Sequence, residues 1–197
     1  MMFLPFANFS RYLASRAVPT LMLELYIGAN AMQRTAIIKA LELTTKSSFV
    51  RISREDQHIL ELGCGTGTFT RQDLLPRCQP FRRIVATDVS EEMVHFARQN
   101  FPHPQMEHDG HDLRAGASKL VKKYGEFDRV YSFFAVHYAQ DQALALRNVS
   151  YPMTEDGERL LVFVARIPGF DIWRRVLGLD RWKSSAEAGR LLCSFVC

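Results

Sequence analysis

The feature that most constrains the fold is the stretch ILELGCGTGTFT, from Ile59 to Thr70. Its apolar run ends in glycines at alternate positions, Gly63, Gly65 and Gly67, and a helix-like segment follows. This pattern predicts a buried parallel strand that turns sharply into a helix. Glycine tolerates positive φ and lets a ligand approach the backbone without interference from a Cβ. The helix behind the turn presents unpaired N–H groups and the positive end of its dipole.

Two classes of cofactor site use such a turn. Dinucleotide-binding enzymes have the pattern G-x-G-x-x-G, and here Gly63 and Gly65 match it, whereas Thr68 occupies the place of its third glycine. The observed spacing is G-x-G-x-G, and the acidic residue Glu61 precedes it. This spacing resembles the first motif of class I S-adenosylmethionine-dependent methyltransferases, whose loop surrounds the methionine end of the cofactor. Residues further along the chain have to decide between the two classes.

The composition is typical of one α/β domain and does not favour nucleic acid as a partner. The chain has 197 residues, its net charge is only +4, and no basic run reaches the length of a binding tail. The 4 cysteines include no C-x-x-C pair, so neither a zinc site nor a disulfide framework is indicated. This usage fits a reducing, cytoplasmic compartment. No apolar stretch has the length of a membrane span, and the sequence indicates no oligomeric state.

Strands and helices are predicted to alternate along the chain. The expected strands are 59–62, 83–88, 105–109, 127–136 and 159–165. The expected helices are 30–43, 69–77, 91–100, 113–124 and 141–149, and a turn is expected at 155–158. This alternation predicts an α/β fold with a doubly wound, mostly parallel sheet that carries helices on both faces. We expect residues 24–197 to form this single domain and residues 1–23 to be an apolar extension without an assigned role.

Polar residues fall at the ends of the predicted strands. In such sheets a ligand binds beyond the carboxyl ends of the strands, where the strand order reverses. The second strand ends on Asp88, whose carboxylate can accept hydrogen bonds from both hydroxyls of a ribose. The third ends at Asp109 and Gly110, which can meet an adenine edge, and the fourth leads to His137 and Tyr138. These positions follow the order that a nucleoside-containing cofactor requires.

Each of these features also has a purely structural interpretation. Asp88 stands where an Asp often begins a helix, and Cys64 is interpreted as a small side chain that fits the turn rather than as a nucleophile. His103, His108 and His111 match no standard zinc spacing, so no metal site is predicted. The cofactor interpretation is preferred because the glycine turn, the two acids and the polar end of the fourth strand occur together.

Four segments of the chain point to a narrower family, namely residues 30–34, 59–67, 84–90 and 127–142. The stretch SFFAVHYAQDQ, from Ser132 to Gln142, is similar to the S-F-x-x-L-H-W-V-Q-x-Q signature of arthropod juvenile hormone acid methyltransferases. This resemblance covers roughly residues 25–182. It implies S-adenosyl-L-methionine as the cofactor and a small apolar carboxylic acid, of the juvenile hormone acid or farnesoic acid type, as the substrate. The alternatives are another small-molecule methyltransferase, such as the trans-aconitate type, and a truncated, non-catalytic remnant that binds cofactor.

The resemblance also implies roles for individual residues. Gln33 is expected to donate to one oxygen of the substrate carboxylate, and His137 and Tyr138 are expected to orient its other side. Tyr138 stands where the family has tryptophan, and Gln33 can also close a capping box with Asn30. The expected cofactor-binding residues are Glu61, Gly63, Cys64, Gly65, Gly67, Asp88, Val89, Met93, Asp109, Gly110 and Ser132.

The last part of the chain is short for this family. The family's sheet closes with a further helix and an antiparallel pair of strands after the fifth strand. Residues 166–197 provide at most a helix at 167–182 and the beginning of a sixth strand at 191–196. We therefore expect a chain truncated at its C-terminus, with a sheet that lacks the last one or two strands.

Overall fold

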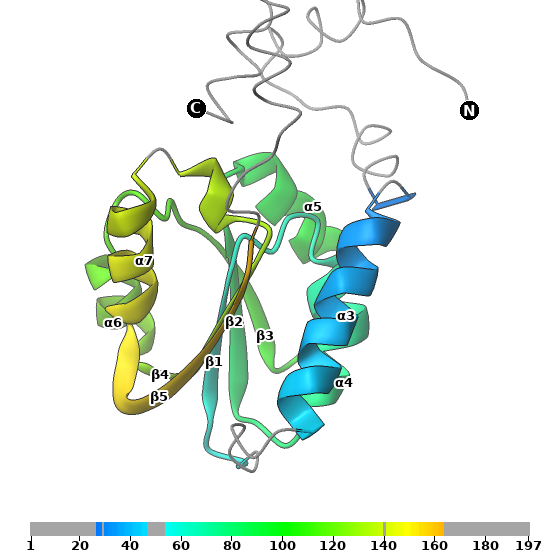
Figure 1. Cartoon of the computed structure of the whole chain (residues 1–197), viewed down its shortest axis with the longest axis horizontal. Coiled ribbons are helices and arrows are strands. Elements are labelled where there is room, and N and C mark those ends of the chain that lie inside the picture. Colours follow the sequence, from blue (N-terminus) through cyan, green and yellow to red (C-terminus); the bar gives the residue numbers. More distant parts are fainter. Residues whose placement is uncertain (1–26, 29, 47–53, 140, 164–197) are drawn as a thin grey trace, which may run out of the picture.

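The computed structural model describes residues 27–28, 30–46, 54–139 and 141–163, and the fold is given for these residues (Figure 1). Their strands form one five-stranded parallel sheet in the order β3-β2-β1-β4-β5. The strands are β1 (His58–Leu62), β2 (Arg83–Asp88), β3 (Met106–Gly110), β4 (Phe127–Phe133) and β5 (Met153–Val162). This arrangement confirms the predicted α/β fold with a parallel sheet.

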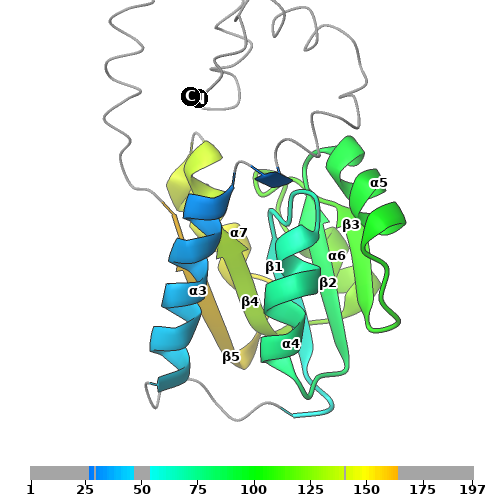
Figure 2. The ribbon, with the colours of Figure 1, turned by 90° about the vertical axis from the view of Figure 1, so that its right-hand side faces the viewer.

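Helices cover both faces of the sheet, and Figure 2 shows α3, α4 and α5 side by side in front of it. This face carries α3 (Ala31–Lys46), the π-helix η2 (Thr70–Leu74), α4 (Leu75–Cys78) and α5 (Glu91–Asn100). The opposite face carries α6 (Ser118–Tyr124) and α7 (Gln142–Ser150). A short 3₁₀ helix, η3 (Val136–Tyr138), follows β4.

The central strand β1 supplies side chains to two separate cores. Ile59 belongs to the cluster that contains Ile37 of α3 and Leu74 of η2. The next residue, Leu60, belongs to the cluster that contains Leu120 of α6. Successive side chains of a strand point to opposite faces of the sheet, and a parallel sheet covered on both faces buries them all. This two-sided burial explains why the strand reads as an almost continuous apolar run.

Two of the predicted helices differ from those of the structure. The helix expected at 69–77 is a π-helix followed by the short helix α4, in which the Leu75 N–H donates to the Thr70 carbonyl. Pro76 has no N–H to offer the Gln72 carbonyl and its ring crowds that group, which accounts for the wider turn. The helix expected at 113–124 is reduced to α6 because Gly116, just before it, takes a φ of 71°.

The fourth strand is shorter than predicted. The sequence pattern extends it over residues 127–136, whereas β4 ends at Phe133. The next residue, Phe134, has a φ of 54°, which no strand accommodates. The chain then forms η3 instead of continuing the sheet.

The turn predicted at residues 155–158 lies inside β5. The pairing passes from Phe127 opposite Met153 to Arg129 opposite Glu158, so residues 154–157 face Asp128 alone. A bulge of this kind inserts extra residues into a strand without ending it. The strand begins earlier than expected because the Phe127 N–H already donates to the Pro152 carbonyl.

Three expectations concern segments outside the described residues. They are the apolar extension 1–23, the helix at 167–182 and the strand at 191–196. Within the described part of the chain, every helix is too short or too polar to traverse a lipid bilayer.

Candidate functional site

The carboxyl ends of the strands meet at one edge of the sheet, and the strand order reverses there between β1 and β4. From β1 the chain proceeds through β2 to β3 on one side, and it then crosses to β4 on the other side of β1. In open α/β sheets this reversal marks the crevice in which ligands bind. The glycine turn that follows β1 lies at this edge (Figure 2).

The glycine turn has a backbone that other residues adopt only with strain. The φ angles of Gly63, Gly65 and Gly67 are 83°, 56° and 75°. A Cβ on Gly63 would overlap the Cβ of Ala135, and a Cβ on Gly67 would lie 2.8 Å from that of Ala97. Because these positions lack side chains, the segment after β4 and the helix α5 both pack directly against the turn.

Asp88, at the end of β2, holds the glycine turn in place. One carboxylate oxygen accepts a hydrogen bond from the Gly65 N–H at 2.8 Å, and the other accepts one from the Ser90 N–H at 3.0 Å. Burial raises the pKa of Asp88, against the opposing effect of these bonds. The Val89 N–H also contributes a hydrogen bond to this carboxylate. Two carboxylate oxygens offer about four acceptor positions, so capacity for a ligand hydroxyl remains.

The residues after Asp88 begin α5 at the same edge of the sheet. Ser90 Oγ accepts a hydrogen bond from the Met93 N–H at 3.3 Å and so caps the N-terminus of this helix. Met93 is half-buried, whereas Val89 is exposed beside the turn. Val89 directly follows Asp88, and Met93 is joined to it through Ser90, whose N–H donates to the Asp88 carboxylate.

Glu61 lies under the turn with only 2% of its surface exposed. Burial raises the pKa of its carboxyl to about 7; the Thr70 hydroxyl opposes this shift and the charge of Asp88 adds to it. Glu61 Oε2 is buried without a hydrogen-bond partner among the described residues. A buried carboxylate oxygen without a partner is costly, so this position suits a ligand that brings positive charge or a hydrogen-bond donor. S-adenosylmethionine carries both, in its sulfonium and ammonium groups.

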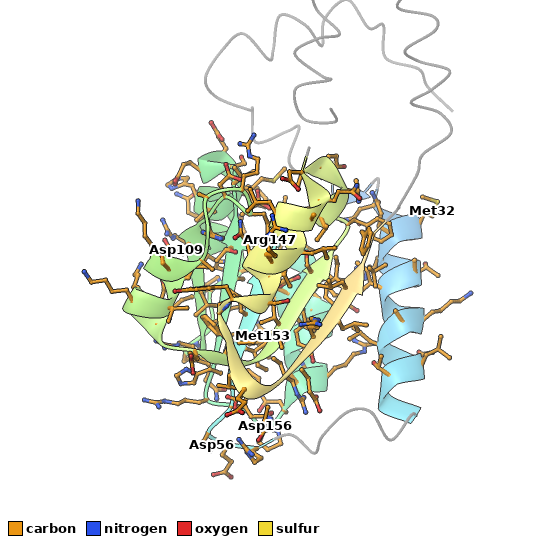
Figure 3. The ribbon with its side chains drawn as sticks, turned by 60° about the vertical axis from the view of Figure 1, so that its left-hand side comes forward. Met32, Asp56, Asp109, Arg147, Met153 and Asp156 are labelled. Carbon is orange, nitrogen blue, oxygen red and sulfur yellow. The ribbon has the colours of Figure 1, made fainter. Side chains whose placement is uncertain are left out.

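At the end of β3 the structure brings Gly110 to the site but directs Asp109 elsewhere. Gly110 is the pairing partner of Asp88. The Asp109 carboxylate accepts hydrogen bonds from the Tyr124 hydroxyl and from Lys123 Nζ of α6, each at 2.9 Å (Figure 3). Burial acts to raise the pKa of Asp109, but these two bonds outweigh it and the pKa is lowered. Its Oδ2 is thus held by α6, while Oδ1 accepts from the Gly110 N–H and lies 3.6 Å from Arg98 Nη2 of α5. The contact of Asp109 with an adenine remains a prediction.

The end of β4 lies against the glycine turn. Ser132 is buried, and its Oγ donates to the Leu62 carbonyl at 3.0 Å, which joins the ends of β4 and β1. A bulky residue with positive φ, such as Phe134, is strained, and strain of this kind is concentrated at functional sites. The bend at Phe134 turns Ala135 onto Gly63.

His137 and Tyr138 of η3 present two uncharged polar rings. Their ring centres are 4.3 Å apart. Burial lowers the pKa of His137, and its Nδ1 is buried without a partner among the described residues. Burial raises the pKa of Tyr138, although 49% of this residue is exposed. At neutral pH the pair therefore offers an imidazole and a phenol that can hydrogen-bond without carrying charge.

Helix α3 is held beside the segment that follows the glycine turn. Ile37 and Leu41 pack in the same cluster as Leu74 of η2. Arg34 Nη2 lies 2.8 Å from Asp73 Oδ2 of η2. Gln33 is half-buried and precedes Arg34 directly, so it belongs to the part of α3 that this ion pair anchors.

The described residues show no arrangement for metal or thiol chemistry at this site. No group of three His, Cys, Asp or Glu side chains among them is placed to hold a metal ion. Burial raises the pKa of the Cys64 thiol well above its usual value. Cys64 therefore keeps its proton and acts as a small buried side chain of the turn.

A polar cavity of about 270 Å³ lies at the opposite end of the sheet. Its lining includes Arg54, Asp128 and Asp156, and Figure 3 labels Asp56 and Asp156 at the end of the molecule away from Met32. Asp128 accepts a hydrogen bond from the His58 N–H, where β1 begins. The length of β1 thus separates this cavity from the glycine turn, and we assign it no part in the chemistry.

Sequence reasoning missed two residues that shape the site. Ala135 is the residue on which Gly63 packs, and a small residue directly after two phenylalanines was the available signal. Glu91 Oε1 lies 2.6 Å from where a Cβ of Gly110 would stand, so this carboxylate covers the tip of β3 beside Asp88.

Comparison with known proteins places this architecture among methyltransferases. Residues 59–157 match a family model described as a methyltransferase domain. The chain is 28% identical over 166 residues to the juvenile hormone acid O-methyltransferase of Bombyx mori. This alignment covers 83% of this chain and 58% of the Bombyx mori protein. The chain is also 28% identical over 162 residues to the juvenile hormone acid O-methyltransferase of Drosophila melanogaster, covering 81% and 54% of the two chains.

A solved structure shows the same fold. The SAM-dependent methyltransferase from Anabaena variabilis matches with a TM-score of 0.57 at 15% identity, covering 83% of this chain and 63% of that one. This likeness concerns the fold alone. The chain spans little more than half the length of the two curated relatives, 58% and 54%.

Replacing Gly67 by alanine is expected to destabilise the protein more than the same change at Gly116. Both residues have positive φ, 75° and 71°, so both replacements strain the backbone. A new Cβ at residue 67 would collide with Ala97 and with the His108 ring. A new Cβ at residue 116 would have no atom within 4 Å. We expect Gly67→Ala to lower the free energy of unfolding by about 1–3 kcal/mol more than Gly116→Ala, as measured by urea denaturation. Equal losses would show that the turn is not packed as described.

The raised pKa of Glu61 predicts a loss of stability as pH rises from 4.5 to about 7. In this window the native state binds more protons than the unfolded state, so stability is greatest below the window and decreases through it. The contribution of Glu61 is at most about 1.4 kcal/mol per pH unit. Glu61→Gln is expected to flatten the pH dependence of the free energy of unfolding, whereas Glu55→Gln, at an exposed position, leaves it unchanged. Parallel curves for Glu61→Gln and wild type would contradict the buried, titrating carboxyl.

Proposed function

Since the chain belongs to the methyltransferase domain family, we propose that it methylates the carboxylate of a small apolar acid, with S-adenosylmethionine as the methyl donor. The observation that carries the proposal is the convergence of the glycine turn, Asp88 and the uncharged η3 pair at one edge of the sheet. The two curated relatives named juvenile hormone acid O-methyltransferases support the acceptor class.

The cofactor half of the proposal rests on groups that are present and matched to the ligand. When bound, S-adenosylmethionine supplies a methyl group activated by a sulfonium. The glycine turn leaves room for its methionine part, Asp88 accepts from its ribose, and Glu61 faces its positive charge. The remaining residues proposed to hold it are Cys64, Val89, Met93, Asp109, Gly110 and Ser132.

The acceptor half requires little acid–base chemistry. A carboxylic acid has a pKa of about 4 to 5, so the acceptor is already ionised at neutral pH and needs no general base. This agrees with the uncharged state of two side chains at the site. The pKa of His137 is lowered, so its imidazole is neutral at neutral pH, and the pKa of Cys64 is raised, so its thiol keeps its proton. The chain has to bind the carboxylate, exclude water and orient one oxygen, and such positioning contributes roughly 7–11 kcal/mol to catalysis.

Each acceptor-side residue has a proposed role. Gln33 donates a hydrogen bond from its amide to one carboxylate oxygen, while His137 and Tyr138 orient the other side. Tyr138 replaces the tryptophan of the family signature, and its phenol adds a hydrogen-bond donor that an indole ring presents differently. A second carboxylate of the acceptor could accept a hydrogen bond from this phenol. For that reason trans-aconitate, which has more than one carboxylate, is tested beside a farnesoic acid-like acceptor.

Replacing Asp88 by asparagine is expected to weaken cofactor binding by about 1–3 kcal/mol, because a charged hydrogen-bond acceptor is lost. The measurement is calorimetric titration of the full chain with S-adenosylhomocysteine. Asp109→Asn is the matched comparison, and we expect a smaller loss there because its carboxylate is engaged by Lys123 and Tyr124. Unchanged binding by Asp88→Asn would remove Asp88 from the site.

Replacing Gln33 by alanine is expected to lower kcat/KM for the acceptor by about 10- to 100-fold, since one carboxylate hydrogen bond is lost. The assay measures methyl transfer to farnesoic acid and to trans-aconitate. Met32→Ala is the control, because Met32 lies on the same helix with 77% of its surface exposed (Figure 3). Equal rates for Gln33→Ala and wild type would disprove the contact. Absence of product despite tight cofactor binding would instead favour a non-catalytic remnant.

A further inference from the structure

We propose that Arg34 and Asp73 are positioning residues whose ion pair ties α3 to the segment behind the glycine turn, so that cofactor binding governs how α3 presents Gln33. The inference rests on the proposed function of Gln33 and adds a coupling between the cofactor and acceptor halves of the site. Neither residue is expected to touch the reacting atoms.

The ion pair is close, and its carboxylate is largely shielded from solvent. Arg34 Nη2 lies 2.8 Å from Asp73 Oδ2, within ion-pair distance but outside hydrogen-bond geometry. The side chain of Asp73 is 8% exposed and that of Arg34 is 40% exposed. A buried carboxylate depends strongly on its cationic partners, so Asp73 holds Arg34 more firmly than an exposed acid would.

A short hydrogen-bonded stretch of backbone connects Asp73 to the glycine turn. Asp73 lies in η2. A hydrogen bond from the Arg71 N–H of this helix to the Gly67 carbonyl, at 3.0 Å, joins η2 to the glycine turn. The segment is a π-helix, a form that is often found at functional sites. A change in the backbone at Gly67 therefore reaches Asp73 within two turns of helix.

On the other side of the ion pair, Arg34 constrains the orientation of α3. Ile37 and Leu41 attach this helix through apolar contacts, which are not directional. Arg34 adds a contact at a defined point, one residue from Gln33 and therefore about 1.5 Å along the helix axis. A shift of about 1 Å in a positioning group can change a rate by about 100-fold, so this anchor is well placed to set the orientation of the amide.

Hydrogen exchange of the full chain tests the tie without relying on activity. The amides of α3 are followed in wild type and in Arg34→Gln, Arg34→Lys and Arg77→Gln, each without ligand and with saturating S-adenosylhomocysteine. Arg77→Gln is the matched control, because Arg77 is also 40% exposed and also pairs with Asp73, at 3.5 Å. Arg77 lies in α4, which directly continues η2, and donates to the Asp73 carbonyl, so these contacts stay on the side of the glycine turn and do not reach α3. Acceptor KM and kcat for methyl transfer are measured in parallel.

The expected results separate Arg34 from Arg77. Without ligand, Arg34→Gln raises the exchange of α3 about tenfold relative to Arg77→Gln. With S-adenosylhomocysteine, the α3 amides of wild type gain protection by about fivefold or more, and Arg34→Gln loses this gain while its affinity for S-adenosylhomocysteine stays within about twofold of wild type. Arg34→Lys restores part of the gain, and Arg34→Gln raises the acceptor KM.

Other outcomes overturn the inference. Unchanged α3 exchange in Arg34→Gln, or equal changes in Arg34→Gln and Arg77→Gln, would show that the ion pair stabilises η2 without tying α3. Binding of S-adenosylhomocysteine that leaves α3 of the wild type unprotected would remove the coupling. Cofactor-dependent protection without methylation of any acid would contradict the proposed function and leave the tie intact. If S-adenosylhomocysteine does not bind the wild type, the proposed function fails, and the ligand-free comparison decides whether the ion pair exists as a tie.

Discussion

The close backbone approach at Gly63 and Gly67 is the constraint on which the rest of the structure depends. Side chains at these positions would collide with Ala135 and Ala97, which belong to the segment after β4 and to α5. Protein interiors are packed too closely to absorb such collisions locally. The missing side chains therefore allow two separate elements to close on the end of β1, and this closure brings the ends of β2 and β4 to one site.

Around that turn, charge is distributed unevenly, and the distribution matches the two halves of the proposed reaction. The cofactor half contains the buried carboxylates of Glu61 and Asp88, which suit a cationic nucleoside. The acceptor half contains the uncharged rings of His137 and Tyr138, which do not repel an anionic carboxylate. In the proposed reaction, a sulfonium donor and a carboxylate acceptor would each lie next to groups of suitable charge.

Local sequence patterns predicted most of the fold because they report on local hydrogen bonding and burial. The apolar run of β1 is a property of a few neighbouring residues, and the buried strand that it predicts is confirmed. The errors occur where a distant partner decides the outcome. Residues 155–158 read as a turn, yet the pairing of β4 with residues on both sides of the bulge keeps β5 in the sheet. Phe134 reads as strand, yet packing of the next residue on the glycine turn bends the chain there.

The sequence by itself determined the glycine turn, the acid at the end of β2 and the order of the strand-end residues, because the turn needs residues without Cβ and the strands alternate at a fixed period. The tertiary structure alone decided that the Asp109 carboxylate faces α6, since this depends on Lys123 and Tyr124, which come from another element. It alone also decided that Arg34 meets Asp73, because an ion pair between two helices is set by how their axes pack and not by spacing along the chain.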